Sequence, residues 1–198
     1  AQKANLGIAV DPDVDRLCFV CEDGSMFGEE YTLVAVADYV LGNKVGNTVS
    51  NMSSTRALKD VTEKHGGAYH SSAVGEVNVV TKMKEVNAVI GGEGNGGIIF
   101  PELHYGRDAL IGIALFLTHL VKSGKTAKQL RNTYPNYFMS KNKVTLENGI
   151  DVGQVFTKIK KKYKSHPINT VDGLKIEFDT DWVHLRTSNT EPIIRIYA

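Results

Sequence analysis

The sequence is poor in cysteine and proline and carries almost no net charge. The few cysteines and the low net charge argue against several classes of protein. Its 198 residues include two cysteines and five prolines, and its formal net charge is +1. Cys18 and Cys21 lie in one strand-like segment at an odd spacing, so their side chains point to opposite faces and cannot easily form a metal pair. So few thiols suit a reducing compartment. The balanced charge argues against a nucleic-acid binder and against recruitment to a membrane surface.

Long apolar runs are also missing, and this bounds the location of the protein. No run approaches the about 20 apolar residues that a membrane-spanning helix needs, and residues 1–5 do not resemble a signal peptide. We therefore expect a cytoplasmic protein. The one dense basic stretch, residues 158–164, is typical of a solvated helix face. Because the chain begins beside its first predicted strand and ends inside its last, we expect a piece of a longer protein that lacks N-terminal domains.

Hydrophobic periodicity divides the chain into two regions. In residues 1–123, short β-branched runs alternate with helix-period segments, which predicts an α/β domain with a mixed, mostly parallel sheet sandwiched by helices. Residues 124–198 change pattern and predict a small α+β domain with an antiparallel sheet. The predicted strands are 7–10, 17–22, 47–52, 68–72, 87–93, 137–146, 173–179, 181–187 and 192–198, and the predicted helices are 29–41, 54–66, 75–86, 108–124, 126–135 and 152–166.

Three aspartates, Asp11, Asp13 and Asp15, alternate directly after the first predicted strand. Carboxylates on a tight turn can converge on one hard cation, and oxygen-only ligation favours magnesium, manganese or calcium over zinc. An EF-hand is excluded because Arg16 stands where its obligatory glycine belongs and because a strand, not a helix, precedes the aspartates. The alternative is a solvated acidic turn. Arg16 itself would balance charge or reach an anionic ligand.

A glycine-rich loop at residues 91–97 contains Glu93 and Asn95. Glycines allow the backbone to approach a ligand closely. The Glu93 carboxylate offers a hydrogen-bond acceptor and Asn95 offers an amide, and both can form hydrogen bonds with sugar hydroxyls. A purely structural glycine-rich hairpin is the competing interpretation. Because ligands gather at the carboxyl ends of strands in such a sheet, we expect the aspartates and Glu93 to meet there.

A third cluster of polar residues lies at residues 186–192, and Arg195 follows it. Hydroxyls, an amide and arginines in one turn can form an anion cradle, and guanidinium groups match phosphate oxygens well. A local turn that caps its own backbone is the alternative. Taken together, a metal site, a polyol loop and a phosphate cradle imply a phosphorylated sugar.

These motifs, in this order, resemble those of the α-D-phosphohexomutase superfamily, which includes phosphoglucomutase, phosphomannomutase and phosphoglucosamine mutase. Residues 11–16 look like its magnesium loop, Asp-Gly-Asp-x-Asp-Arg, residues 91–97 like its sugar loop, Gly-Glu-x-Ser-Gly-His, and residues 186–192 like the phosphate loop of its last domain. The resemblance implies Mg2+ ligation by Asp11, Asp13 and Asp15, a catalytic role for Arg16, substrate binding by Glu93 and Asn95, and phosphate binding by Arg186, Ser188, Asn189 and Thr190. From the residues themselves we add Arg107 to the expected substrate-binding residues and Arg195 to the expected phosphate-binding residues.

The implied activity is reversible phosphoryl transfer between O1 and O6 of a hexose phosphate. In this superfamily a phosphoserine donates the group, a hexose 1,6-bisphosphate is the intermediate, and Mg2+ bridges the phosphoserine and the aspartates. The usual serine motif, Thr-x-Ser-His-Asn-Pro, is absent, and residues 51–55 do not replace it. The chain therefore resembles the third and fourth of the superfamily's domains, and we expect no mutase activity from it alone.

The sequence departs from the superfamily's pattern at several positions. Pro12 replaces a glycine and should stiffen the turn, Asn95 replaces a serine, Gly97 stands where a histidine is usual, and Val77 stands where many members carry a basic residue. These departures leave the general acid or base unassigned. The residues that could compensate are Asn78, His104 and Arg107.

Two other functions compete with the mutase. One is a sugar-phosphate binding module without catalysis. The absence of a basic residue at Val77 and of a histidine at Gly97 supports this alternative. The other is a metal-dependent phosphatase, which is disfavoured because Asp15 fills the threonine position of the Asp-x-Asp-x-Thr motif. The sequence does not distinguish glucose, mannose and glucosamine as the hexose.

Overall fold

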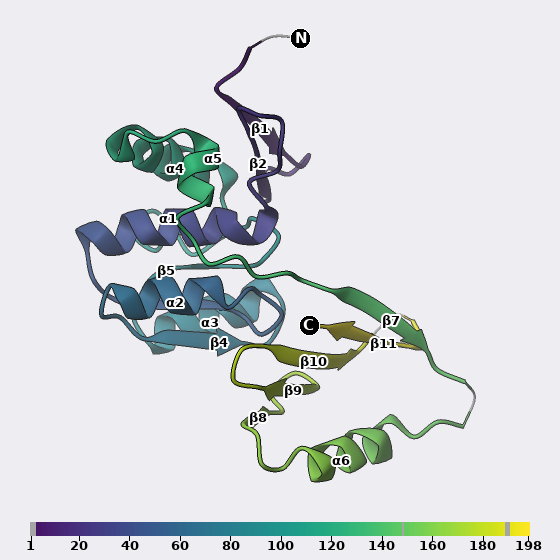
Figure 1. Cartoon of the computed structure of the whole chain (residues 1–198). Helices are drawn as coiled ribbons and strands as arrows, with labels where there is room; N and C mark the ends of the chain where they lie inside the picture. Colours follow the sequence, from purple (N-terminus) through teal and green to yellow (C-terminus); the bar gives the residue numbers. More distant parts are fainter. Residues whose placement is uncertain (1–2, 148, 189–190) are drawn as a thin grey trace. The chain divides into compact units, whose positions relative to one another are not determined.

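The computed structural model describes residues 3–147, 149–188 and 191–198 (Figure 1). The chain forms two compact units, Ala1–Tyr137 and Phe138–Ala198. Among the described residues, every helix is too short or too polar to cross a membrane. The elements of the first unit are β1 (Leu6–Val10), β2 (Leu17–Cys21), α1 (Glu29–Asn43), β3 (Asn47–Asn51), α2 (Ala57–Lys64), β4 (Tyr69–Ser72), α3 (Glu76–Glu85), β5 (Ala88–Gly92), β6 (Ile98–Ile99), α4 (Ala109–Ser123) and α5 (Ala127–Arg131).

A four-stranded sheet in the order β4-β3-β5-β6 lies at the centre of the first unit. β3 pairs in parallel with both β4 and β5, while β6 pairs antiparallel with β5. Parallel neighbours require long crossovers, and α2 and α3 supply them between β3, β4 and β5. The prediction of a mixed, mostly parallel sheet is therefore confirmed.

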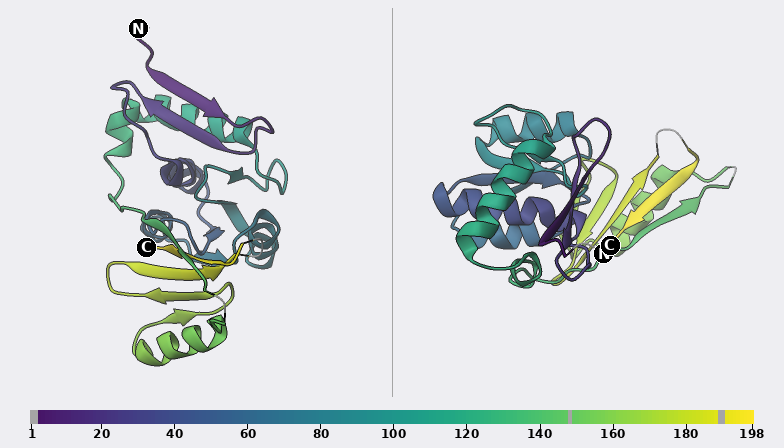
Figure 2. Two further views of the ribbon diagram at one scale, coloured as in Figure 1. Left: turned by 90° about the vertical axis from the view of Figure 1, so that its right-hand side faces the viewer. Right: turned by 90° about the horizontal axis from the view of Figure 1, so that it is seen from above.

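Helices cover both faces of this sheet, with α2 on one side and α3 on the other (Figures 1 and 2). Ile98 and Ile99 are consecutive in β6 and point to opposite faces, because successive strand residues alternate. Ile98 packs into the large core that includes α1 and α2, and Ile99 packs with Val79 and Met83 of α3. The sheet therefore separates two hydrophobic cores, as both-sided helix cover requires.

β1 and β2 form a separate two-stranded antiparallel hairpin. This differs from the sequence-based expectation, which placed both strands in the parallel sheet. Only residues 11–16 connect the two strands, and a parallel pair would need a crossover of about a dozen residues or more. The aspartates therefore lie on a hairpin turn.

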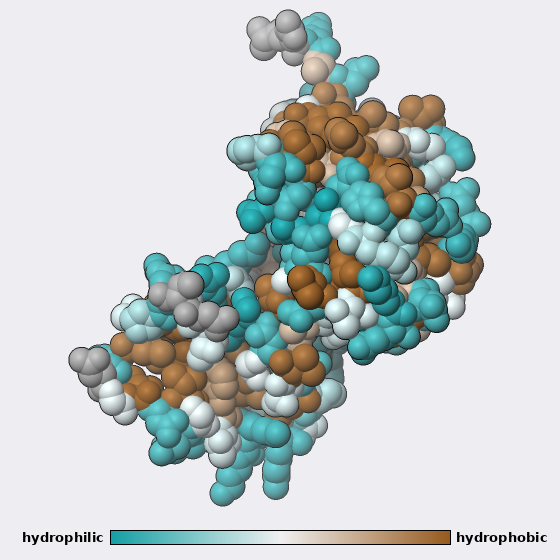
Figure 3. All heavy atoms as spheres, turned by 180° about the vertical axis from the view of Figure 1, so that it is seen from behind, coloured by the Kyte–Doolittle hydropathy of each residue, from teal (hydrophilic) through white to brown (hydrophobic). Residues whose placement is uncertain are grey.

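Aromatic packing attaches the hairpin to α4. Phe19 of β2 stacks on Phe116 of α4 with ring centroids 3.8 Å apart, and Phe27 meets Phe116 edge-on at 5.0 Å. All three rings are fully buried, and such pairs add to the free energy gained from burying their area. The other strand is less covered: Ile8 and Val10 are 44% and 45% exposed, and Figure 3 shows apolar side chains at the surface around the hairpin.

The second unit is built on a five-stranded, wholly antiparallel sheet in the order β7-β11-β10-β9-β8. Leu174, Ile176 and Trp182 form part of its buried interior. The predicted small α+β domain with an antiparallel sheet is thus confirmed. Its elements are β7 (Lys141–Thr145), α6 (Val152–Lys162), β8 (Ile168–Asn169), β9 (Leu174–Glu177), β10 (Trp182–Thr187) and β11 (Ile193–Tyr197).

The structural division falls after Tyr137 and not at 123/124, where the sequence placed it. Gly124 does end α4 in a left-handed conformation, but the chain then folds back onto the first unit. Ala127 and Leu130 of α5 are buried in its core, and the Tyr134 hydroxyl donates to Asp38 Oδ2 at 3.1 Å. The change of pattern after the helix placed the boundary there, whereas packing keeps residues 124–137 in the first unit.

Candidate functional site

The hairpin turn is shaped by hydrogen bonds from its own backbone. Oδ1 of Asp11 accepts the backbone N–H groups of Asp15 at 3.1 Å and Arg16 at 3.0 Å. Val14 adopts a positive φ of 58°, which is uncommon for a β-branched residue, and its carbonyl accepts the Ala109 N–H at 3.0 Å. The turn is therefore fixed both internally and by the start of α4.

Asp11, Asp13 and Asp15 converge as the sequence predicts. Each offers a carboxylate oxygen that lies within 4.8 Å of the other two, and no other such group occurs among the described residues. Oδ1 of Asp15 is buried and has no hydrogen-bond partner within the described parts of the chain. A buried acceptor without a donor is unfavourable unless a cation or water satisfies it. Arg16 Nε lies 3.8 Å from this oxygen, too far for a hydrogen bond. Three carboxylates, one of them with a buried oxygen that accepts no hydrogen bond, fit a hard divalent cation such as Mg2+.

The protonation equilibria of two of these aspartates differ. Backbone N–H donation, first from Arg16, holds the pKa of Asp11 below its ordinary value. Burial raises the pKa of Asp15, and the charges of Asp13 and Asp11 act in the same direction, while Arg107 opposes them. The cost of burial and of the neighbouring negative charges thus falls mainly on Asp15.

Glu93 follows β5 and is buried, with 5% of its surface exposed. Its Oε1 accepts Asn51 Nδ2 at 2.8 Å and the Gly75 N–H at 3.1 Å. Asn95 faces its own loop, since its Oδ1 accepts the Gly97 N–H at 3.1 Å. Asn51, at the end of β3, was not predicted as a site residue, although its place at a strand's carboxyl end was a usable signal.

Arg107 lies between the aspartate turn and the glycine-rich loop. Its guanidinium donates to Asp15 Oδ2 through Nη2, to Glu93 Oε2 through Nη1 at 3.0 Å and to Glu76 Oε2 through Nε at 3.2 Å. Its side chain is 14% exposed. A Cβ placed on Gly97 would lie 2.5 Å from Cδ of Arg107, so the missing side chain leaves room for this arginine.

The other residues considered as replacements lie elsewhere. Asn78 Nδ2 donates to the Val74 carbonyl of the preceding turn at 2.9 Å. His104 Nε2 lies 3.0 Å from Oδ2 of Asp108, the residue that caps α4. Val77 is 78% exposed and carries no charge. Of the three candidates, only Arg107 contacts the predicted site residues.

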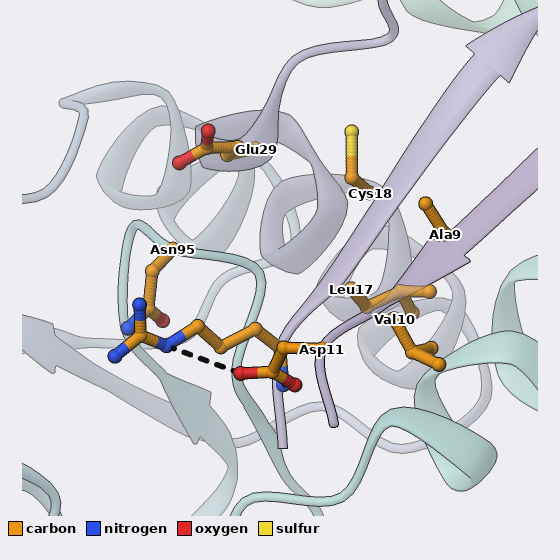
Figure 4. A pocket seen from close by; sticks show the side chains of 8 residues that line it. Ala9, Val10, Asp11, Leu17, Cys18, Glu29 and Asn95 are labelled. Carbon is orange, nitrogen blue, oxygen red and sulfur yellow. Dashed lines mark hydrogen bonds and ion pairs between the residues drawn. The ribbon is translucent and has the colours of Figure 1, made fainter. Parts of the chain in front are cut away.

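A surface pocket of about 250 Å3 opens beside the aspartate turn (Figure 4). Figure 4 shows Asp11 and Asn95 toward one end and Cys18 and Glu29 toward the other. The sequence did not single out Glu29, which lies in the first turn of α1. Burial raises the pKa of the Cys18 thiol, which stays protonated near neutral pH. The pocket is lined by Ala9, Val10, Asp11, Arg16, Leu17, Cys18, Glu29 and Asn95.

In the second unit, the strand register places basic residues side by side. Arg186 of β10 is opposite Arg195 of β11, which is opposite Lys143 of β7. Like charges directly opposite each other are unfavourable unless anions balance them. Arg186 Nε donates to Asp172 Oδ2 at 2.8 Å, and Arg195 lies 3.6 Å from a Glu191 oxygen. This row is the candidate anion site of the second unit.

The predicted phosphate loop is only partly described. The backbone N–H of Ser188 donates to the Ile193 carbonyl at 3.0 Å and closes the turn between β10 and β11. Asn189 and Thr190 lie outside the described residues. Their predicted role in phosphate binding therefore stays a prediction.

Comparison with known proteins identifies the family of the chain. The family model described as phosphoglucomutase/phosphomannomutase, alpha/beta/alpha domain III, matches residues 28–137, which is more than half of the chain. The chain therefore belongs to the phosphoglucomutase/phosphomannomutase family. The match begins after the hairpin and ends at the boundary of the first unit.

Individual relatives cover nearly the whole chain. It is 37% identical over 198 residues to a phosphoglucomutase/phosphomannomutase of Thermococcus kodakarensis, and 33% identical over 200 residues to a probable phosphoglucosamine mutase of Methanopyrus kandleri. These alignments cover 98% and 99% of this chain but only 43% and 44% of the relatives. A crystal structure of a phosphoglucomutase/phosphomannomutase family protein from Burkholderia thailandensis superposes with a TM-score of 0.82 at 26% identity, covering 99% of this chain and 42% of that one. The chain thus spans less than half the length of these relatives.

Proposed function

We propose that this chain is part of a phosphohexomutase that transfers a phosphoryl group reversibly between O1 and O6 of a hexose phosphate through a hexose 1,6-bisphosphate. The observation that carries the proposal is the aspartate turn: three converging carboxylates, with the buried Oδ1 of Asp15 lacking a hydrogen bond among the described residues. Membership of the mutase family supplies the reaction class.

Asp11, Asp13 and Asp15 would hold Mg2+. The bound ion would neutralise charge on the transferring phosphoryl group. Arg16 would assist from the same turn, because its side chain is 58% exposed and its contacts with Asp11 and Asp15 are long, at 3.5 and 3.8 Å. A guanidinium held so loosely keeps donors available for phosphoryl oxygens.

Glu93 and Asn95 would orient the sugar. Glu93 Oε1 already accepts two hydrogen bonds and Oε2 accepts one, so Oε2 retains capacity for a substrate hydroxyl or amine. Asn95 lines the pocket beside the turn and would present its amide to a second hydroxyl. These contacts do not distinguish glucose, mannose and glucosamine derivatives.

The second unit would bind the phosphate that is not being transferred. Arg186 and Arg195 would supply the guanidinium groups, with Ser188, Asn189 and Thr190 as the polar residues of the loop. The phosphoryl donor, a serine in a Thr-x-Ser-His-Asn-Pro motif, is not in this sequence. We therefore expect the chain alone to lack turnover.

A magnesium-dependent mutase assay on a full-length protein that contains this chain tests the proposal. Glucosamine-1-, mannose-1- and glucose-1-phosphate would each be primed with the corresponding bisphosphate, and 31P NMR would follow the positional exchange. We expect exchange with at least one sugar and no exchange with the 198-residue chain. Release of inorganic phosphate without exchange would instead indicate a phosphatase.

A sugar-phosphate binding module is the second candidate. Val77 is exposed and uncharged, and Gly97 has no side chain where the family usually carries a histidine. Saturable binding of a hexose phosphate with no exchange and no phosphate release, by a protein that does carry the serine motif, would favour this function over the mutase.

A further inference from the structure

A single guanidinium joins three carboxylates that come from three separate segments. Arg107 contacts Asp15 on the hairpin turn, Glu93 after β5 and Glu76 at the start of α3. Its backbone N–H also donates to Glu76 Oε1 at 3.1 Å. Each of its three guanidinium nitrogens faces a different acid, an arrangement that a planar fork allows and a lysine ammonium does not.

The contact between Arg107 and Asp15 determines which Asp15 oxygen accepts no hydrogen bond. Arg107 occupies Oδ2, while Oδ1 is buried and lacks a hydrogen bond among the described residues, with the exposed Arg16 Nε 3.8 Å away. Asp11 is held differently, by two backbone N–H groups of its own turn. Asp15 is therefore the aspartate whose orientation depends on a distant side chain, which lies 92 residues along the chain.

Gly97 makes the position of Arg107 attainable. A Cβ at Gly97 would meet Cδ of Arg107 at 2.5 Å and Oδ1 of Asn95 at 3.1 Å. Because the end of the arginine is bound to three acids, its Cδ cannot swing aside without breaking these contacts. A side chain at position 97 and the observed Arg107 conformation therefore exclude each other.

We propose that Arg107 is a positioning residue that holds Oδ2 of Asp15 so that Oδ1 faces the cation, and that the same guanidinium links this turn to Glu93 of the sugar loop. The inference rests on the function proposed above, since it takes the aspartate turn as the metal site. Outer partners of metal-ligating carboxylates commonly affect metal affinity by about 10- to 100-fold. Arg107 is thus assigned to the metal site without being a ligand of the metal.

The test is a Mn2+ titration of the 198-residue chain, followed by electron paramagnetic resonance. Arg107→Gln removes the guanidinium, and Gly97→Ala displaces it without changing any charge. We expect both variants to bind Mn2+ about 10- to 100-fold more weakly than the unmodified chain, with an altered spectrum of the bound ion. Arg107→Lys keeps the charge but not the fork, so it should not restore the affinity.

Two control variants match these changes. Lys44→Gln removes one positive charge at the surface of the same unit, where Lys44 pairs with Glu102 at 2.7 Å. Gly42→Ala adds a methyl group whose nearest neighbour would be 3.7 Å away, an ordinary contact. Both controls should bind Mn2+ as the unmodified chain does. Thermal unfolding without metal identifies any variant that fails to fold, and either Arg107→Gln or Gly97→Ala suffices for the test.

The outcomes separate this inference from the proposed function. If the unmodified chain binds Mn2+ and the Arg107 and Gly97 variants bind it equally or more tightly, the positioning role is overturned and the metal site stands. Full recovery in Arg107→Lys would reduce the role to charge balance and also overturn it. Binding by the variants alone would make Arg107 a competitor of the cation. If no form binds Mn2+, both the metal site and the inference fail.

Discussion

Asn51, the last residue of β3, donates its Nδ2 hydrogen to Oε1 of Glu93 across 2.8 Å, and both side chains are buried. The parallel pairing of β3 with β5 brings these residues together, because it places the carboxyl ends of the two strands side by side. Oδ1 of the same asparagine accepts the Ser53 N–H and the Ser54 hydroxyl, each at 3.0 Å. Asn51 therefore sets both the position of Glu93 and the turn that follows β3.

Asn51→Asp is expected to destabilise the protein, because it replaces a donor to Glu93 with a second carboxylate in a buried position. The loss of a hydrogen bond to a charged group should lower the free energy of unfolding by about 2 kcal/mol or more. Urea unfolding at neutral pH measures this change. Asn132→Asp makes the same chemical change at an exposed position and should stay within about 0.5 kcal/mol. Equal effects of the two substitutions would contradict the assigned role.

Asp13→Asn should separate cation binding from folding. Asp13 is exposed and forms no hydrogen bond or ion pair within the described residues, while its charge opposes that of Asp15. Losing one charged ligand should weaken Mn2+ binding about tenfold or more. The melting temperature without metal should stay the same or rise slightly. Asp179→Asn, an exposed aspartate of the second unit, is the charge-matched control. A turn that is only a solvated acidic loop would show no difference between the two variants.

Acid should destabilise the first unit through Asp38. Burial alone would raise the pKa of this carboxyl, but hydrogen bonds with His119 and His65 hold it well below its ordinary value. A pKa that is lower in the folded state stabilises the protein above the unfolded pKa of about 3.9, and this stabilisation is lost as the pH falls below that value. Asp38→Asn should therefore remove part of the acid sensitivity. Urea unfolding of both proteins at pH 6 and pH 3 checks this. If the free energy of unfolding falls as much between the two pH values in Asp38→Asn as in the unmodified chain, the prediction is contradicted.

Arg195→Gln should weaken phosphate binding by the second unit. Arg195 lies opposite Arg186 and beside Lys143, and within the described residues its one ion pair is the 3.6 Å contact with Glu191. Removing one charge-assisted contact should reduce phosphate affinity about tenfold. Calorimetric titration of inorganic phosphate measures the change, and Lys164→Gln removes an exposed charge from the same unit as a control. Identical affinities would show that the basic row does not bind phosphate.

The sequence determined the local parts of this protein. Hydrophobic periodicity predicted the main strands and helices, and the alternate spacing of Asp11, Asp13 and Asp15 on a tight turn predicted their convergence. Both signals extend over only a few residues, and at this range backbone geometry and side-chain type are enough to determine the local structure. The composition of the glycine-rich loop likewise indicated Glu93 and Asn95, although not which atoms contact them.

Only the tertiary structure decided the contacts between distant segments. The bond from Asn51 to Glu93 depends on parallel strand pairing, and the three acids around Arg107 come from segments that meet only after the sheet and helices pack. The unit boundary after Tyr137 depends in the same way on α5 folding back. Such contacts join residues far apart in the sequence, so packing selects them and no local pattern encodes them.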